Sequence, residues 1–324
     1  MMPVIHRLPI LILNPFSRCN CRCRMCDIWK RTEPELISRH ALERHLESLE
    51  GYGLQWVVVS GGEPLMHPDI SGLCAVLRAR RLRVTILTAG LLLERHAGPL
   101  AAYVDDLIVS LDGPPPVHDF IRRVDGAFTK LAAGVRAVRT IRPDFPVAAR
   151  CTVQKANHTH LSEAVATALD LGLNSISFLA ADLHSAAFHR PQGWPLGHQQ
   201  EIALSREQIP ALEAETEALI DSGKCGKFIP ETPQKLRRIV HHFRAHLGLS
   251  APTAPRCNAP WVSAVIEADG ALRPCFFHPS VGQVAPGLSA ADVLNGPQAI
   301  AFRSTLNVDA NPICRRCVCS LHLQ

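Results

Sequence analysis

Four cysteines lie within eight residues near the N-terminus, in the stretch CNCRCRMC (residues 19–26). Cys19, Cys23 and Cys26 have the spacing C-x3-C-x2-C. Three thiolates on one short loop can hold three irons of a four-iron cluster and leave the fourth iron open to another ligand. A zinc knuckle is the alternative, and it usually takes a fourth ligand from close by. Spacing alone does not choose between the two, and Cys21, which is out of this register, is expected to point elsewhere.

A second group of cysteines lies near the C-terminus. Cys257 and Cys275 flank Gly270 as C-x12-G-x4-C, and Cys314 and Cys317 follow as C-x2-C. The sequence WVSAVIEADGALRPC, which ends at Cys275, predicts a β-hairpin that turns at its Asp-Gly dipeptide and brings the first two cysteines to its open end. Two pairs make a complete four-thiolate site, which suits a zinc ribbon and an iron–sulfur cluster equally well.

The composition indicates a protein of the cytoplasm. The chain has twelve cysteines and no secretory signal, so a reducing compartment is expected and disulfides are not. Cys74 and Cys151 are predicted to be core thiols, and Cys225 lies in a polar turn. The net charge of +5 is spread over 324 residues, which argues against a nucleic-acid partner, and no apolar run is long enough to span a membrane.

Strand and helix patterns alternate six times along the first half of the chain. Amphipathic helical stretches separate six short apolar runs, and such repeats predict a parallel sheet with helices outside it. Periodicity leaves open whether the sheet is doubly wound or a partial barrel. A long loop is predicted over 180–206, a helix over 233–247 and a linker over 251–255. The predicted strands are Leu8 to Leu13, Trp56 to Ser60, Arg83 to Thr88, Leu107 to Leu111, Val147 to Val153 and Ser175 to Leu179.

Polar residues follow two of the predicted strands directly. The sequence SGGEP (60–64) ends the second strand, where Gly61 and Gly62 allow close backbone approach and Glu63 offers a carboxylate to an ammonium group. The fourth strand ends in SLDG (110–113), whose hydroxyl and carboxylate can bind sugar hydroxyls. Arg122, twelve residues after Ser110, can hold a carboxylate through two hydrogen bonds.

Together these motifs resemble the radical S-adenosylmethionine (radical SAM) superfamily. The cysteine motif after the first strand, GGEP after the second, SLDGP and HDxxR at the fourth, and TVQKAN (152–157) at the fifth occur in order over residues 8 to about 180. The resemblance implies a mixed α/β fold, a partial (β/α)6 TIM-like barrel with its ligands at the carboxyl ends of the strands.

The resemblance also implies a role for each matching residue. Cys19, Cys23 and Cys26 would hold a [4Fe-4S] cluster whose open iron binds the amino and carboxylate groups of S-adenosylmethionine. Cys21 stands where the family usually has an apolar residue and would pack in the core. The residues implied to contact the cofactor are Met25 near the adenine, Gly61, Gly62 and Glu63 at the ammonium group, Ser110 at the ribose or the methionine end, Asp112 at hydroxyl groups, and Arg122 at the carboxylate.

The C-terminal cysteines resemble the SPASM/Twitch auxiliary domain of radical enzymes. The short tail is similar to the Twitch form, in which one auxiliary [4Fe-4S] cluster is held by four cysteines, here Cys257, Cys275, Cys314 and Cys317. Cys319 is the alternative to Cys317. The predicted domains are a radical SAM core over 1–225, a helical connector and linker over 226–256, and the auxiliary-cluster domain, a hairpin plus a helix, over 257–324.

The resemblance implies a radical SAM oxidoreductase that abstracts a substrate hydrogen. A fully ligated auxiliary cluster suits electron transfer, which favours a two-electron oxidation of a small alcohol or sugar-like substrate. A flavodoxin- or ferredoxin-type protein is the implied electron donor. The alternatives are a maturase that forms crosslinks in a ribosomal peptide and, in another class, a zinc-stabilised non-catalytic binding protein. Fewer than twenty residues precede Cys19, so no fused leader-binding domain is expected.

The substrate base cannot be assigned from the sequence, so the catalytic residue is left unknown. His184, His189 and His198, in the predicted loop after the sixth strand, lie near the expected mouth of the barrel and could each take a proton. Asp182 is a further candidate. The alternative interpretation of the three histidines is a mobile lid that exposes them to solvent.

Overall fold

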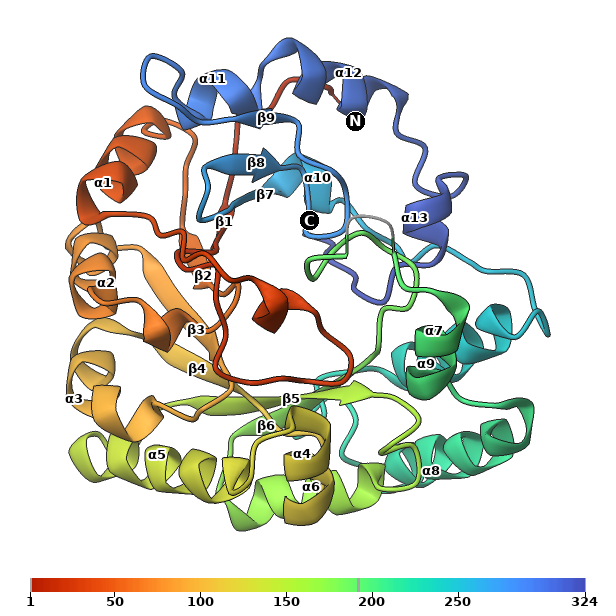
Figure 1. The fold of residues 1–324 in the computed structure, drawn as a ribbon. Helices are drawn as coiled ribbons and strands as arrows, with labels where there is room; N and C mark the ends of the chain where they lie inside the picture. The colour runs from red at the N-terminus through yellow and green to blue at the C-terminus, as the bar shows by residue number, and fades with distance from the viewer. Residues whose placement is uncertain (1, 191–192, 324) are drawn as a thin grey trace.

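The computed structural model describes residues 2–190 and 193–323. Its strands form one sheet in the order β6-β5-β4-β3-β2-β1-β7-β8-β9, and the sheet does not close into a barrel. Figure 1 shows the sheet curving around the centre of the molecule with helices on its outside. The strands are β1 Ile10–Leu13, β2 Trp56–Val59, β3 Arg83–Thr88, β4 Asp106–Ser110, β5 Val147–Val153, β6 Ser175–Ala180, β7 Ser263–Ile266, β8 Ala271–Arg273 and β9 Gly282–Gln283.

The first six strands confirm the predicted α/β partial barrel. They pair in parallel with their sequence neighbours, as strand–helix repeats require. Side chains along β5 alternate between buried and half-buried. Successive residues of a strand point to opposite faces, so the half-buried set, which includes Arg150 and Thr152, faces the interior of the barrel. The predicted strand from Leu8 begins only at Ile10, because Pro9 has no N–H to donate to the ladder.

Helices cover the outer face of this sheet. In the described part of the chain, α1 to α6 lie between β1 and β6, α7 to α9 follow β6, and α10 to α13 lie from residue 259 onward; short 3-10 turns occur at Ile28–Lys30, Pro64–Met66 and Arg206–Gln208. The helices are α1 Arg39–Ser48, α2 Ile70–Ala79, α3 Leu93–Tyr103, α4 Pro115–Arg122, α5 Ala127–Ile141, α6 Leu161–Asp170, α7 Leu196–Ile202, α8 Ile209–Asp221, α9 Pro233–His246, α10 Ala259–Val262, α11 Ala290–Leu294, α12 Pro297–Thr305 and α13 Pro312–Arg315.

The C-terminal hairpin joins the sheet of the barrel. β7 pairs in parallel with β1, with Ile10 opposite Ser263, and β8 then pairs antiparallel with β7. The predicted turn is present, and Gly270 has a φ of +87°, a backbone conformation that favours glycine. One sheet therefore connects both cysteine groups, while the predicted boundaries 1–225, 226–256 and 257–324 stay a prediction.

The predicted loop 180–206 is more ordered than its composition suggests. It contains α7, and a buried ion pair joins Asp182 to Arg190 at 2.5 Å. Trp194 donates its ring N–H to the Asp27 carboxylate at 2.8 Å, which ties the loop to the segment just after the first cysteine group. Pro191 and Gln192 of this loop lie outside the described residues. In the described part of the chain, no helix has both the length and the apolar character needed to cross a membrane.

Candidate functional site

A cavity of about 200 Å³ lies at the carboxyl ends of the strands. The loop that follows β1, drawn in red, runs across the middle of the view in Figure 1 and carries the first cysteine group. All four cysteines of that loop line the cavity, together with Met25, Gly61, Gly62, Glu63, Ser110 and Arg122. Tertiary structure thus brings together every residue that the sequence predicts for cofactor binding, with the exception of Asp112.

The cysteine loop presents alternate residues to the two sides. Cys21, Cys23 and Met25 are buried, whereas Arg22 is exposed and Arg24 half-buried. Backbone hydrogen bonds hold this loop against the end of α4, from Arg22 N to the carbonyl of Arg122 and from Arg24 N to the carbonyl of Ile121. Cys21 is only 1% exposed, as a packed side chain would be, but it lines the same cavity as Cys19, Cys23 and Cys26, so the prediction that it points elsewhere is wrong.

The sulfur atoms provide a donor set suited to an iron–sulfur cluster. A hydrogen bond from Cys21 lowers the pKa of Cys23 to about 7, and the charge of Arg122 acts in the same direction against burial. A thiol with this pKa is about half thiolate at pH 7, and the thiolate is the form that binds metal. Burial raises the pKa of Cys26 well above its usual range, and iron would have to displace that proton.

The side chains as placed do not converge on a single ion. Among residues 2–190 and 193–323, no three His, Cys, Asp or Glu side chains surround a position suited to one metal ion. A four-iron cluster binds each thiolate at a different iron, so its ligands need to surround a cluster-sized space rather than meet at a point. Three cysteines around one cavity fit that requirement.

Gly62 allows the loop after β2 to contact the cysteine loop. A Cβ atom at this position would lie 2.1 Å from the carbonyl oxygen of Arg18, and the neighbouring Glu63 donates its N–H to that same oxygen at 2.8 Å. Gly61 has a φ of +104°, which also favours glycine. Both glycines were predicted to make room for a ligand. The structure shows that Gly62 makes room for the backbone at Arg18, next to Cys19.

The Glu63 carboxylate is held rigidly in the cavity wall. It is buried and accepts hydrogen bonds from the hydroxyl of Thr88 and the backbone N–H of Ala89, both at 2.8 Å, and from the N–H of Leu65 at 3.0 Å. Burial raises its pKa, although these donors act in the opposite direction. A carboxylate fixed in this way is suited to accept a further hydrogen bond from an ammonium group.

The structure places Asp112 differently from the prediction. Its side chain is fully buried behind the cavity, forms a 2.6 Å ion pair with Arg122 and accepts the N–H of Thr152 at 3.0 Å. Because its carboxylate is already used, direct contact with sugar hydroxyls is not what this geometry provides. Asp112 instead positions the guanidinium of Arg122, which also lies 3.5 Å from the sulfur of Cys23. The side chain of Asn157 donates to the Asp112 carbonyl at 2.9 Å, which gives the TVQKAN motif a structural role.

The cysteines of the second group come from the two ends of the hairpin and from the last part of the chain. Cys257 precedes α10, Cys275 follows β8, and Cys314 and Cys317 lie in and just after α13. After burial, the charge of Cys257 is among the effects that raise the pKa of Cys275, Cys314 and Cys317, and it acts in the same direction on Cys319. The thiol of Cys317 is hydrogen-bonded to the carbonyl of Cys319 at 3.2 Å.

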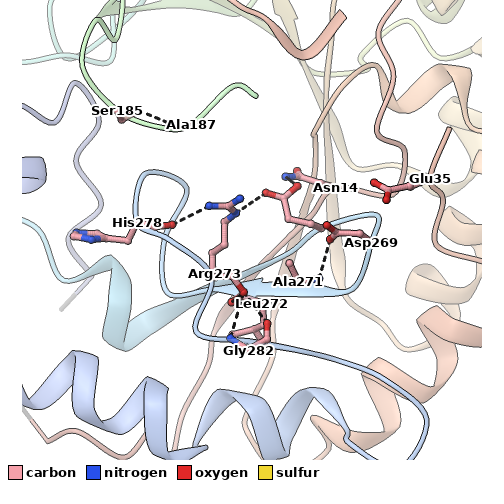
Figure 2. Close-up of polar contacts among 12 residues, drawn as sticks. Asn14, Glu35, Ser185, Ala187, Asp269, Ala271, Leu272, Arg273, His278 and Gly282 are labelled. Carbon is pink, nitrogen blue, oxygen red and sulfur yellow. Dashed lines mark hydrogen bonds and ion pairs between the residues drawn. The ribbon is translucent and has the colours of Figure 1, made fainter. Parts of the chain in front are cut away.

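A chain of polar contacts fixes the hairpin beside these cysteines. Asn14, just after β1, donates to Glu267 at 2.9 Å, and Arg273 donates to Glu267 at 3.0 Å. Arg273 also donates to the carbonyl of His278 at 3.1 Å, a contact that Figure 2 shows. The ring of His278 is buried, and its Nε2 lies 3.3 Å from the sulfur of Cys314. Burial lowers the pKa of His278 to about 4, so the ring is neutral at physiological pH and its N–H can point at the sulfur.

A second cavity, of about 120 Å³, adjoins the first. Arg150, Leu179 and Val318 line both cavities, and Cys317 and Cys319 line the second. Arg150 was not among the site residues predicted from the sequence. The available signal was a charged residue inside the predicted strand, in phase with Thr152, which also lines the first cavity.

The candidate bases lie in different environments. Asp182 lines the first cavity, but it is buried and paired with Arg190. His184 is half-buried and contacts His246 at 3.2 Å, and its pKa is lowered to about 4 by burial and by the nearby charge of Arg316. The alternative prediction, a mobile lid with solvent-exposed histidines, is therefore wrong for His184. His189 and His198 do not line the cavity of the first cysteine group, and no base is assigned.

Comparison with known proteins agrees with the geometry. The Radical SAM superfamily matches residues 13–177, and the iron-sulfur cluster-binding domain SPASM matches residues 257–318. GTP 3',8-cyclase 1 of Pseudomonas aeruginosa is 26% identical over 279 residues, which cover 84% of this chain and 81% of that protein. The subtilosin biosynthesis protein AlbA of Bacillus subtilis is 24% identical over 271 residues, 81% of this chain and 53% of AlbA.

Solved structures support the same fold. Streptococcus suis SuiB bound to S-adenosylmethionine superposes with a TM-score of 0.69 at 15% identity, over 98% of this chain and 74% of SuiB. At this identity the similarity concerns the fold alone. It shows that the partial barrel and the C-terminal hairpin occur together in a known architecture.

Proposed function

Because the chain belongs to the radical SAM superfamily, we propose that it is an enzyme that removes a hydrogen atom from a substrate and oxidises that substrate by two electrons. The family and its SPASM region imply [4Fe-4S] clusters and S-adenosylmethionine as cofactors. When bound, a cluster with one open iron supplies the electron that splits S-adenosylmethionine into methionine and the 5′-deoxyadenosyl radical that takes the substrate hydrogen.

The residues of the first cavity have distinct proposed roles. Cys19, Cys23 and Cys26 hold the cluster, and the carboxylate of Glu63 accepts the ammonium group of S-adenosylmethionine. Arg122 carries a fixed positive charge beside Cys23, so it binds the cofactor carboxylate and favours the thiolate form of its neighbour. Asp112 keeps that guanidinium in place. Met25 and Ser110 contact the rest of the cofactor from the same cavity wall.

One observation supports the oxidation. Val318 lines the cavity of the first cysteine group, while its neighbours Cys317 and Cys319 line the adjoining cavity. An auxiliary cluster held by Cys257, Cys275, Cys314 and Cys317 would therefore adjoin the space where a substrate radical forms. After a hydrogen atom is removed, the substrate must lose one more electron and one proton to reach a carbonyl, and a nearby cluster can accept that electron.

A small alcohol or sugar-like molecule is the proposed substrate. The relative with the greatest mutual coverage among those described is named for a reaction of GTP, a small molecule with a sugar. Ser110, Arg150 and Thr152 offer polar groups around the cavity that suit such a ligand. Crosslinking of a ribosomal peptide is a second candidate, because the similarity to AlbA, a protein of bacteriocin biosynthesis, extends over 81% of this chain.

Metal content and cofactor cleavage test the proposal. Anaerobically reconstituted protein is expected to bind about eight irons and about eight sulfides, falling to about four of each in the Cys19→Ala/Cys23→Ala/Cys26→Ala variant. With a strong reductant and S-adenosylmethionine, the unaltered protein should form methionine and 5′-deoxyadenosine, and the variant should form neither. About four irons with one zinc would remove the electron acceptor, and zinc without iron would refute the radical mechanism.

A further inference from the structure

The cysteine loop has an outward face whose character is opposite to that of the cavity. Its cysteines point inward, whereas Arg22 is exposed on the other side and Arg24 is half-buried beside it. Cys21, Cys23 and Met25 line the cavity, whereas Arg22 and Arg24, which stand between them in the chain, do not. One thickness of backbone therefore separates the sulfur atoms from a positively charged surface.

Neighbouring residues enlarge this surface. The guanidinium of Arg24 lies 4.0 Å from the ring centre of Phe120, which is 53% exposed at the end of α4. The charges of Lys30 and Arg123 lie 5.6 and 6.0 Å from the ring centre of Trp29. We call this set of residues the arginine face: Arg22, Arg24, Trp29, Lys30, Phe120 and Arg123.

The charge of the arginine face is largely unbalanced. Lys30 pairs with Asp27 at 2.9 Å. Within residues 2–190 and 193–323, no ion pair of 4.0 Å or less involves Arg22, Arg24 or Arg123. Arg22 and Arg123 are exposed and have no such partner, and cations of this kind are suited to bind a negatively charged protein surface.

We propose that the arginine face is the docking site for an acidic electron-donor protein with an exposed flavin or iron–sulfur group. The inference rests on the proposed function, because reductive cleavage of S-adenosylmethionine takes one electron from outside the chain. A donor bound here would pass that electron across the loop backbone to the cluster, while the cavity on the other side stays free for cofactor and substrate. The donor is oxidised by one electron and the cluster is reduced by one, so the step needs no further reactant.

Electrostatic attraction makes a quantitative expectation possible. Complementary charges raise the association rate of two proteins by ten- to a thousandfold, and salt suppresses the effect. Arg22→Glu/Arg24→Glu reverses two charges outside the cavity and leaves every proposed ligand in place. Arg95→Glu/Arg136→Glu is the matched control, since both of its arginines are exposed, lie on α3 and α5, and have no ion pair in the described part of the chain.

The experiment measures 5′-deoxyadenosine formation with two donors. Reduced flavodoxin is the acidic protein, and reduced methyl viologen is a small cation that lost attraction cannot slow. With flavodoxin, the Arg22→Glu/Arg24→Glu variant is expected to be about tenfold slower or more, and raising salt from about 50 mM to about 500 mM should slow only the unaltered and control proteins. With methyl viologen, all three proteins should react alike.

Equal flavodoxin rates in the two double variants would refute the docking site. If the loop variant loses iron, Arg123→Asp tests the same surface from outside the cysteine loop, because aspartate tolerates the φ of 54° at this position. A normal flavodoxin rate in that variant would also refute the proposal. An unaltered protein that forms no 5′-deoxyadenosine with either donor would instead refute the proposed function.

Discussion

The contact at Gly62 allows a sharp test of how the two loops of the site are held together. In Gly62→Ala, the new Cβ would lie 2.1 Å from the oxygen and 2.6 Å from the carbon of the Arg18 carbonyl. Both are backbone atoms, so no side-chain rotation can relieve the overlap. The two loops must separate, and the 2.8 Å hydrogen bond from Glu63 N to Arg18 would lengthen or break.

The cost follows from these two effects. Overpacking costs about 1–3 kcal/mol, and a lost hydrogen bond adds about 1 kcal/mol, so the free energy of unfolding should fall by about 3 kcal/mol. Denaturant unfolding followed by circular dichroism measures this change, and iron analysis should show partial loss of the first cluster. Gly197→Ala is the control. Gly197 is exposed on α7, no atom beyond its own turn and chain neighbours lies within 4 Å of the new Cβ, and removing a helical glycine should stabilise the protein by about 0.5–1 kcal/mol.

A Gly62→Ala protein with full iron content and a loss below about 1 kcal/mol would refute this reasoning. The result would mean that the cysteine loop does not rest on the loop after β2 as the structure describes.

Three further predictions concern the C-terminal half. Cys317→Ser should lose about four irons and Cys319→Ser none, since the first is the proposed ligand; the reverse pattern in iron analysis would exchange their roles. His278→Gln should lower the reduction potential of the auxiliary cluster by about 40 mV, which corresponds to the loss of one hydrogen bond to Cys314 worth about 1 kcal/mol. A redox titration in the Cys19→Ala/Cys23→Ala/Cys26→Ala background, which lacks the first cluster, measures this shift. Burial lowers the pKa of His242 to about 3, below its unfolded value of about 6.5. The free energy of unfolding should therefore be highest above pH 6.5 and fall by about 2 kcal/mol between there and pH 5, where the unfolded state binds the proton and the folded state does not. Denaturant unfolding at several pH values should show a weaker pH dependence in His242→Gln, and an unchanged dependence would contradict the assignment.

Local patterns were sufficient for most of the barrel. The predicted strands over 83–88 and 147–153 have the same bounds as β3 and β5, because apolar β-branched runs leave little choice of conformation. The helix predicted over 233–247 is α9, which begins with Thr232 as its N-cap and Pro233 in its first turn. The Asp-Gly turn of the hairpin was equally clear, since Gly270 adopts the positive φ that this turn requires.

Other features depend on residues that are distant in sequence. Nothing near Asp112 indicates that its partner is Arg122, so its predicted contact with a ligand could be corrected only by the fold. The loop 180–206 looked mobile from its composition, yet the Asp182–Arg190 pair and the bond from Trp194 to Asp27 order it. Pairing of β7 with β1 likewise requires strands that are more than 250 residues apart.

The sequence by itself determined which residues are proposed to carry the chemistry, because thiolate spacing and the glycines at strand ends are local properties of the chain. It also determined the parallel sheet that gathers those residues at one edge. Only the tertiary structure decided that Val318 and Arg150 connect the two cysteine groups through adjoining cavities, and that Arg22 and Arg24 face away from both. Those relations depend on how the strands curve and on where the last residues of the chain return to the barrel, and no short-range pattern records either.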